Sequence, residues 1–132
     1  MVKAPGCGPG KRVQVPPSPQ KRIKMTNKKR ATGHKYDKDK NRYDLMPPRA
    51  LDSVVEILTY GAAKYADRDW EKGIEWGRLF GAAQRHLWSF WRGEDIDPES
   101  GLPHLSHAAC NILMLIEYYF LHNGTDDRAK EK

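Results

Sequence analysis

RHLWSFWRGEDIDPESGLPHLSHAACN, residues 85–111, is the stretch of this 132-residue chain that decides its fold. It contains the end of one predicted helix, an acidic turn and the start of a second helix. Three histidines and four acidic residues gather here: His86, His104, His107, Glu94, Asp95, Asp97 and Glu99. So many ligand-type side chains beside apolar helix faces indicate a functional cluster, although one such histidine alone would favour a hydrogen-bonded core residue.

The two flanking helices, residues 77–92 and 101–122, both direct histidines toward packed surface. The first has an apolar stripe through Leu79, Ala83, His86 and Phe90. The second has one continuous face formed by His104, His107, Asn111, Met114 and Tyr118, and the face beside it is apolar. Gly93 ends the first helix, and we expect Ser100 to cap the second, with Pro103 tolerated in the first turn.

A further helix is predicted over residues 49–66, after Pro47 and Pro48 hold the chain extended. Its apolar stripe runs through Leu51, Val54, Val55, Leu58 and Ala62, and Ile57 lies off this stripe. Residues 67–76 form a turn in which Trp70 would pack over the helices or stack on a ligand base. Since no strand pattern occurs, we expect an all-α fold of three main helices in an antiparallel bundle.

Charge divides the chain into a basic segment and a mildly acidic body. Residues 1–33 hold nine Lys or Arg and no acid, which leaves 14 basic against 17 acidic residues in 34–132. The mean hydropathy of −0.80 indicates that part of the chain does not fold. We expect a disordered basic tail over 1–33, an all-α domain over 34–124 and a charged C-terminal tail over 125–132. Nucleic acid would bind weakly, through the basic tail alone.

The cysteines and the hydropathy pattern bear on the compartment. Cys7 and Cys110 form neither a CxxC pair nor a disulfide framework, which favours a reducing, intracellular setting. No run of about 18 apolar residues occurs, so no membrane span is expected. The basic N-terminus lacks the apolar core of a secretory signal. We therefore expect a cytoplasmic protein.

The spacing of the histidines is compatible with a metal site. His104 and His107 lie one helical turn apart, so both imidazoles can reach one point. His86 would approach from the neighbouring helix, and Glu94 or Asp97 would complete a mixed nitrogen and oxygen shell. Such a shell suits Mn²⁺, Co²⁺, Zn²⁺ or Fe²⁺ better than Mg²⁺. Alternatively, the acids hold the metal and the histidines contact substrate phosphates directly.

Other side chains would complete a site for a phosphorylated small molecule. The candidates to hold phosphates are Lys40, Arg42, Lys64 and Arg85, and those to contact the rest of the substrate are Tyr65, Trp70 and Asn111. The charge pattern of residues 34–48 fits a solvated linker equally well. With the acids, these residues suggest a metal-activated water that attacks phosphorus. No P-loop or GxGxxG motif is present, which argues against a Walker-type site.

Three segments in order carry a family resemblance: KYDKDKNRYDLMPPRAL (35–51), GAAKYADRDWEKG (61–73) and residues 85–111. Together they resemble the phage dATP/dGTP diphosphohydrolase N-terminal-domain family, which looks related to the MazG-like all-α nucleotide pyrophosphohydrolases. The resemblance spans roughly residues 34–122. It implies a MazG-like bundle that hydrolyses dGTP or dATP to the monophosphate and pyrophosphate, in phage nucleotide metabolism. It also implies a divalent cofactor, Mg²⁺, Mn²⁺ or Co²⁺, with Zn²⁺ as a further option.

The chain departs from the MazG pattern at the metal ligands. MazG-like enzymes bind Mg²⁺ through an EExxE motif, and the nearest equivalent here is the pair Asp52 and Glu56. Glu94 and Asp97 keep ExxD spacing, but in a turn before Pro98. Either the metal shell is rebuilt from His86, Glu94, Asp97, His104 and His107, or the relationship to MazG is remote.

Two alternative functions and an oligomer follow from the same features. A metal phosphohydrolase that releases phosphate or triphosphate would give different products. A small helical nucleic-acid-binding protein would depend on residues 1–33 and lack activity on nucleotides. Three helices of this length cover their apolar faces poorly, so we expect a homodimer or homotetramer.

Overall fold

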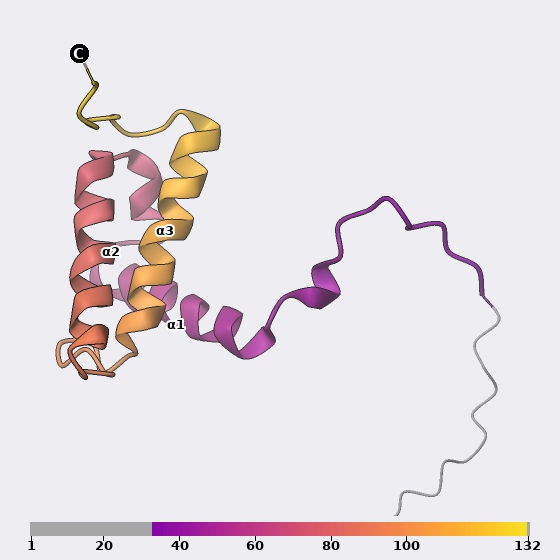
Figure 1. Ribbon diagram of the computed structural model, residues 1–132, viewed down its shortest axis with the longest axis horizontal. Helices are drawn as coiled ribbons and strands as arrows, with labels where there is room; N and C mark the ends of the chain where they lie inside the picture. Colours follow the sequence, from indigo (N-terminus) through magenta and orange to yellow (C-terminus); the bar gives the residue numbers. More distant parts are fainter. Residues whose placement is uncertain (1–32, 132) are drawn as a thin grey trace, which may run out of the picture. The chain divides into compact units, whose positions relative to one another are not determined.

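The computed structural model describes residues 33–131, and three helices form its body (Figure 1). They are α1 (Pro48–Lys64), α2 (Trp76–Trp91) and α3 (His104–Leu121), within the unit Lys40–Lys132. Short 3-10 helices, η1 (Tyr43–Leu45) and η2 (Asp69–Lys72), precede α1 and α2. No strand forms between residues 33 and 131, so the all-α prediction is confirmed. The predicted basic tail falls outside the described residues, apart from Gly33.

Helix α3 is the central element, because it packs against both α1 and α2. Val54 and Ile57 of α1 and Cys110 of α3 form the buried cluster on one side of α3. On α2, Leu79 and Ala83 are 5% and 3% exposed, as the predicted stripe required. The end of α2 meets the start of α3, so these two helices run antiparallel (Figure 1).

The predicted buried stripe of α1 is rotated from the observed one. Leu51 and Val55 were expected inside but are 44% and 48% exposed, whereas Ile57, expected off the stripe, is 6% exposed. Since α1 packs mainly on α3, it buries a narrow strip centred on Val54 and Ile57. Periodicity identified the helix but could not show which of its apolar residues would meet a neighbour.

The start of α3 also differs from expectation. Its N-cap residue is Pro103, and Ser100, the expected cap, lies four residues before the helix begins. The backbone N–H of His104 donates to the carbonyl of Asp95 at 3.0 Å, so the acidic turn satisfies a donor that a cap would otherwise serve. The hydroxyl of Ser100 is used within the candidate site instead.

The charged segment after α3 is attached to the start of α2. The backbone N–H of Trp76 donates to the carbonyl of Thr125 at 2.9 Å, and the N–H of Gly77 donates to Asp127 at 2.7 Å. The guanidinium of Arg128 lies 5.0 Å from the ring centre of Trp76. Thr125, Asp127 and Arg128, in the segment expected to form a charged tail, therefore contact the start of α2.

The part of the chain that the structure describes contains no helix long and apolar enough to cross a membrane.

Candidate functional site

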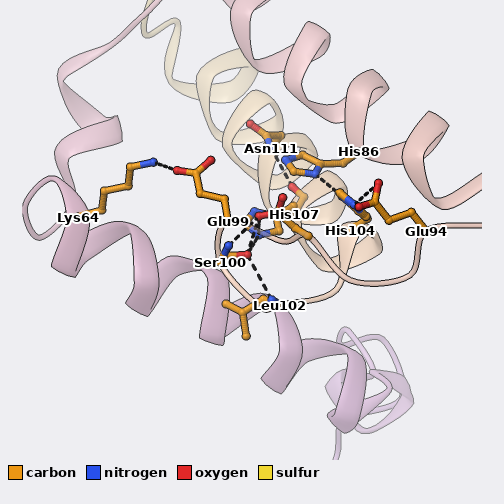
Figure 2. Close-up of polar contacts among 10 residues, drawn as sticks. Lys64, His86, Glu94, Glu99, Ser100, Leu102, His104, His107 and Asn111 are labelled. Atoms are coloured by element: carbon orange, nitrogen blue, oxygen red, sulfur yellow. Dashed lines mark hydrogen bonds and ion pairs between the residues drawn. The ribbon is translucent and has the colours of Figure 1, made fainter.

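Three imidazoles meet where the end of α2 approaches the start of α3 (Figure 2). The Nδ1 atoms of His86 and His104 are 2.8 Å apart, within hydrogen-bond distance. The rings of His86 and His107 stack with centroids 4.5 Å apart and an interplanar angle of 10°. His104 and His107 are buried, with 4% and 9% exposure. The structure thus brings together the three histidines that the sequence placed on facing helices.

The acidic turn folds back onto the start of α3 because its own backbone closes it. The N–H of Asp97 donates to the carbonyl of Leu102 at 2.9 Å, and the N–H of Gly101 donates to the carbonyl of Asp97 at 2.8 Å. Gly101 has φ +71°, in the left-handed region that glycine adopts without strain. This closed turn holds two carboxylates beside the imidazoles.

Each carboxylate faces one histidine. Oε2 of Glu94 lies 3.4 Å from Nε2 of His104, and Oδ2 of Asp97 lies 3.5 Å from Nε2 of His107. Glu94 is half exposed, whereas the side chain of Asp97 is largely covered. The two predicted acidic site residues therefore lie at the histidine cluster.

Ser100 connects Asp97 to His107 and determines the tautomer of that histidine. Its hydroxyl donates to Oδ2 of Asp97 at 2.7 Å and accepts the N–H of Leu102 at 3.2 Å. Because its one proton goes to Asp97, its 2.7 Å contact with His107 requires a proton on Nε2 of the imidazole. Neutral His107 therefore keeps a lone pair on Nδ1. Sequence reasoning took Ser100 for a helix cap; the Asp-x-x-Ser spacing of a side-chain-bonded turn was the available signal.

A similar argument orients His104 and His86. Nε2 of His104 is buried and has no hydrogen-bond partner among the described residues, and its nearest charged group is the Glu94 carboxylate. A proton on that nitrogen faces the carboxylate favourably, whereas a bare lone pair would be repelled. With Nε2 protonated, Nδ1 of His104 accepts a hydrogen bond from Nδ1–H of His86. The free lone pair of His86 is then on Nε2.

Burial and neighbouring charges control protonation at the cluster. Burial lowers the pKa of His86, and positive charge on His107 or His104 would lower it further. Burial also lowers the pKa of His107, against the opposing effect of the Asp97 carboxylate. At Asp97, burial raises the pKa, but hydrogen bonds from Ser100 outweigh it and bring the pKa below its ordinary value. The imidazoles His86 and His107 are thus neutral and Asp97 is ionised near neutral pH.

Helix α1 contributes a cation to the edge of this cluster. The ammonium of Lys64 bonds to the carboxylate of Glu99, which raises the lysine pKa (Figure 2). It lies 5.9 Å from the ring centre of Tyr60 and 5.4 Å from that of Tyr65. The ring of Tyr60 meets His107 edge to face at 6.4 Å. The sequence named Lys64 and Tyr65 as candidate substrate contacts but gave no indication of Tyr60, which lies one turn before Lys64 on α1.

Two further predicted residues border the histidines. Asn111 lies one turn along α3 from His107, and its Nδ2 donates to the carbonyl of that residue at 2.8 Å. Arg85 is exposed and directly precedes His86. Its positive charge disfavours protonation of that imidazole.

The remaining predicted substrate contacts lie elsewhere. Trp70 packs on Tyr118, with ring centroids 6.2 Å apart. Tyr118 follows His107 by eleven residues, roughly 16 Å along the helix axis. Arg42 forms an ion pair with Asp44, and no recorded contact among residues 33–131 connects it or Lys40 with the histidines.

The site offers carboxylate and imidazole donors to the expected divalent ion. Within residues 33–131, no three His, Cys, Asp or Glu side chains surround a common point as a bound ion would require. The donor types nevertheless fit, because carboxylates and imidazoles together suit divalent transition ions. In the tautomers assigned above, Nε2 of His104 carries a proton, so the free donors are the carboxylates of Glu94 and Asp97 and the nitrogen lone pairs of His86 and His107. The metal site stays a prediction.

Comparisons with known proteins agree on one family. The sequence profile of the family described as "dATP/dGTP diphosphohydrolase, N-terminal" matches residues 30–128. A protein of Salmonella phage PMBT28 named dATP/dGTP diphosphohydrolase is 34% identical over 99 residues, which are 74% of this chain and 33% of that protein. The chain therefore spans about a third of the length of this relative. No solved structure is significantly similar to the chain.

Proposed function

Because the chain belongs to the dATP/dGTP diphosphohydrolase N-terminal family, we propose that it hydrolyses purine deoxynucleoside triphosphates. The products would be the nucleoside monophosphate and pyrophosphate, from dGTP, dATP or both. The relative from Salmonella phage PMBT28 is named dATP/dGTP diphosphohydrolase, and the family match over residues 30–128 includes the histidine cluster of this chain. The expected location is the cytoplasm, where nucleotides are found.

The observation that carries the proposal is the arrangement of His86, His104 and His107 with two carboxylates at one end of α2 and α3. The neutral imidazoles of His86 and His107 each have a free nitrogen lone pair that can accept a proton. At the edge of the same cluster, the ammonium of Lys64 bonds to Glu99. An anionic phosphate can replace Glu99 as the partner of that ammonium. Acceptor and cation are the two kinds of group that phosphoanhydride hydrolysis needs.

The reaction consumes one water. The water oxygen forms a bond to the α-phosphorus as the bond from that phosphorus to the α,β-bridging oxygen breaks, and pyrophosphate leaves with the bonding electrons. The proton of the water passes to a basic nitrogen, for which Nε2 of His86 and Nδ1 of His107 are the candidates. Lys64 would stabilise negative charge on the phosphates, beside the rings of Tyr60 and Tyr65.

We also propose that the activity depends on a divalent ion held by Glu94 and Asp97 with one or more of the three histidines. When bound, such an ion would neutralise charge on the phosphate oxygens and favour ionisation of water. Support comes from the donor chemistry, two carboxylates beside imidazole nitrogens.

Product analysis tests the reaction. The purified chain is incubated with each dNTP and NTP, with Mg²⁺, Mn²⁺, Co²⁺ or EDTA, and the products are separated by anion exchange. We expect dGMP or dAMP with equimolar pyrophosphate, and loss of turnover by at least about 100-fold in Asp97→Asn and His107→Gln. Asp67→Asn, an exposed carboxylate between α1 and η2, and His34→Gln are the matched controls and should retain activity.

The outcomes separate the alternatives. Release of orthophosphate or triphosphate would contradict the pyrophosphohydrolase assignment and favour a different metal phosphohydrolase. Absence of turnover with every metal, in a protein of normal helix content, would contradict hydrolysis by this chain. Full activity in EDTA would refute the metal dependence alone.

A further inference from the structure

A second feature of the molecule is an apolar surface on α2 and α3, at the end away from the histidines. We call it the α2–α3 face, and its members are Trp76, Phe80, Ile112, Ile116, Tyr119 and Phe120. These residues line an open groove of about 610 Å³, with Asp127 and Arg128 at its rim. Phe80 and Tyr119 are each 58% exposed and Phe120 is 70% exposed. None of these side chains takes part in the proposed reaction.

The exposed side of α3 has the spacing of a helix–helix seam. Ile112, Ile116 and Tyr119 follow one another at intervals of 4 and 3 residues, and Leu105 precedes Ile112 by seven residues. Such alternation holds one apolar stripe against a partner helix over several turns. No helix within residues 33–131 covers this stripe, since Ile112 and Ile116 remain 43% and 44% exposed.

Helix α2 presents a matching stripe beside it. Gly77, Phe80, Gln84, Leu87 and Trp91 recur at intervals of 3, 4, 3 and 4 residues. Phe80 and Gly77 line the same groove as Ile112, Ile116 and Tyr119. The antiparallel pair α2 and α3 therefore offers two adjacent seams, which is half of a four-helix bundle core.

The size of the face argues for a protein partner. At about 200 Å² for each aromatic side chain, Phe80, Tyr119 and Phe120 alone leave on the order of 350 Å² uncovered. Monomeric soluble proteins rarely expose larger contiguous patches. Together with Ile112, Ile116 and the rim residues, the face approaches the roughly 800 Å² per partner that a stable interface buries. Glu117 is the one Asp, Glu, Lys or Arg in α3, and a helix so apolar on all sides is normally enclosed.

We propose that a second copy of this chain covers the α2–α3 face, so that α2 and α3 of two protomers form a two-fold symmetric four-helix bundle. Both seams are present on every copy, which is the condition for a self-complementary interface. Asp127 and Arg128 lie together at the rim, so a two-fold axis can bring each charge near its opposite on the partner subunit. Residues 1–32, with nine basic residues and no apolar periodicity, are chemically unsuited to the groove.

Sedimentation velocity and light scattering of the full chain at about 1 to 50 μM test the proposal. We expect a dimer, and Ile116→Glu should yield monomers or weaken the dimer at least 100-fold while far-UV circular dichroism retains the helix signal. Val55→Glu on α1 is the matched control, because Val55 is 48% exposed but does not line the groove. It should remain dimeric.

Phe80→Arg provides a second route should Ile116→Glu fail to fold. Phe80 lies on α2, is more exposed than Ile116, and its replacement leaves α3 unchanged. Wild-type protein that is monomeric over the whole concentration range would overturn the proposal, as would a dimer that persists in folded Ile116→Glu or Phe80→Arg. These readouts use mass alone, so they do not depend on whether the chain hydrolyses nucleotides.

Discussion

At the scale of single residues, the three imidazoles act as one unit because they are in contact. His86 shares a hydrogen bond with His104 and stacks on His107, so a proton on one ring disfavours a proton on the others. Burial acts in the same direction on His86 and His107. The folded chain therefore binds fewer protons at this cluster than the unfolded chain does.

The first prediction concerns pH and stability. The folded-state pKa values of His86 and His107 lie below the ordinary 6.5, so below that pH the unfolded state binds more protons. The free energy of unfolding should therefore be greatest above about pH 7 and fall as the pH drops through 6.5 toward the folded-state values. Urea unfolding at pH 7.5, 6.5 and 5.5, in EDTA, measures it.

Substitution of a histidine identifies the imidazole responsible for this pH dependence of the free energy of unfolding. His86→Gln should make the stability less sensitive to pH over this range, whereas His34→Gln, at an exposed position, should leave the sensitivity unchanged. Stability in the wild type that is constant or rises between pH 7.5 and 5.5 would contradict the protonation argument.

The second prediction concerns Ser100, whose hydroxyl joins the acidic turn to α3. Ser100→Ala removes bonds to Asp97, His107 and the N–H of Leu102. We expect a loss of about 1–3 kcal/mol in unfolding free energy, because partly buried polar groups lose their partners. Activity should fall as well, since the tautomer of His107 is no longer imposed.

Ser89→Ala is the matched control, since Ser89 is half-buried on α2 and its side chain makes no recorded hydrogen bond among residues 33–131. Urea denaturation and steady-state kinetics on both variants give the comparison. Equal stability and equal activity in the two would refute the connecting role of Ser100.

At the scale of elements, α2 is held at its start by residues that follow α3. Glu75, the N-cap residue of α2, makes no side-chain cap bond, and Asp127 supplies the missing acceptor for the N–H of Gly77. The side chain of Asn123 similarly donates to the carbonyl of Glu71 at 2.7 Å. The negative charge of Asp127 at the N-terminus of α2 also interacts favourably with the helix dipole.

The third prediction tests this long-range cap. Asp127→Ala should lower the free energy of unfolding by about 0.5–2 kcal/mol, the range for the loss of an N-cap. Asp67→Ala, an exposed acid between α1 and η2 without a recorded partner among residues 33–131, should change it by less than about 0.5 kcal/mol. Thermal and urea denaturation report both; equal effects would show that Asp127 contributes only surface charge.

At the scale of the whole molecule, charge is distributed unevenly along the sequence. Residues 1–32 carry nine of the 23 basic residues and no acid, so their removal changes the net charge from +6 to −3. The proposed site and the α2–α3 face both lie in the acidic remainder. Any affinity for polyanions is therefore expected to reside in residues 1–32.

The fourth prediction is that deletion of residues 1–32 leaves nucleotide hydrolysis unchanged and abolishes binding to duplex DNA. In the full chain this binding should be weak and fall steeply with salt, as counterion release requires. Fluorescence anisotropy at 50 and 200 mM salt, beside the product assay, measures both. Loss of hydrolysis in the shortened chain would assign residues 1–32 a role in the reaction.

Prediction from sequence succeeded where a pattern was local. The three helices, the inward direction of His86, His104 and His107, and the turn that carries Glu94 and Asp97 all depend on residues close in sequence. The family resemblance rested on ordered motifs, and the family match supports it.

Prediction failed where a contact joined distant segments. The buried side of α1 was misplaced, because Ile57 rather than Val55 meets Cys110 on α3. Tyr60 was missed because its place beside His107 depends on how α1 crosses α3. Trp70 was expected either to pack over the helices or to stack on a ligand base; it packs on Tyr118, and the base contact stays a prediction.

The amino-acid sequence by itself determined the helical class, the element boundaries to within a few residues and the donors available for chemistry, because helix periodicity and turn residues act over short range. Only the tertiary structure decided which of those side chains are in contact. Ser100 bonds to His107, and His104 bonds to His86. The tertiary structure also decided which apolar stripes remain uncovered. Those outcomes depend on the packing of helices against one another, and the free energy of packing belongs to surfaces that meet only in the folded chain.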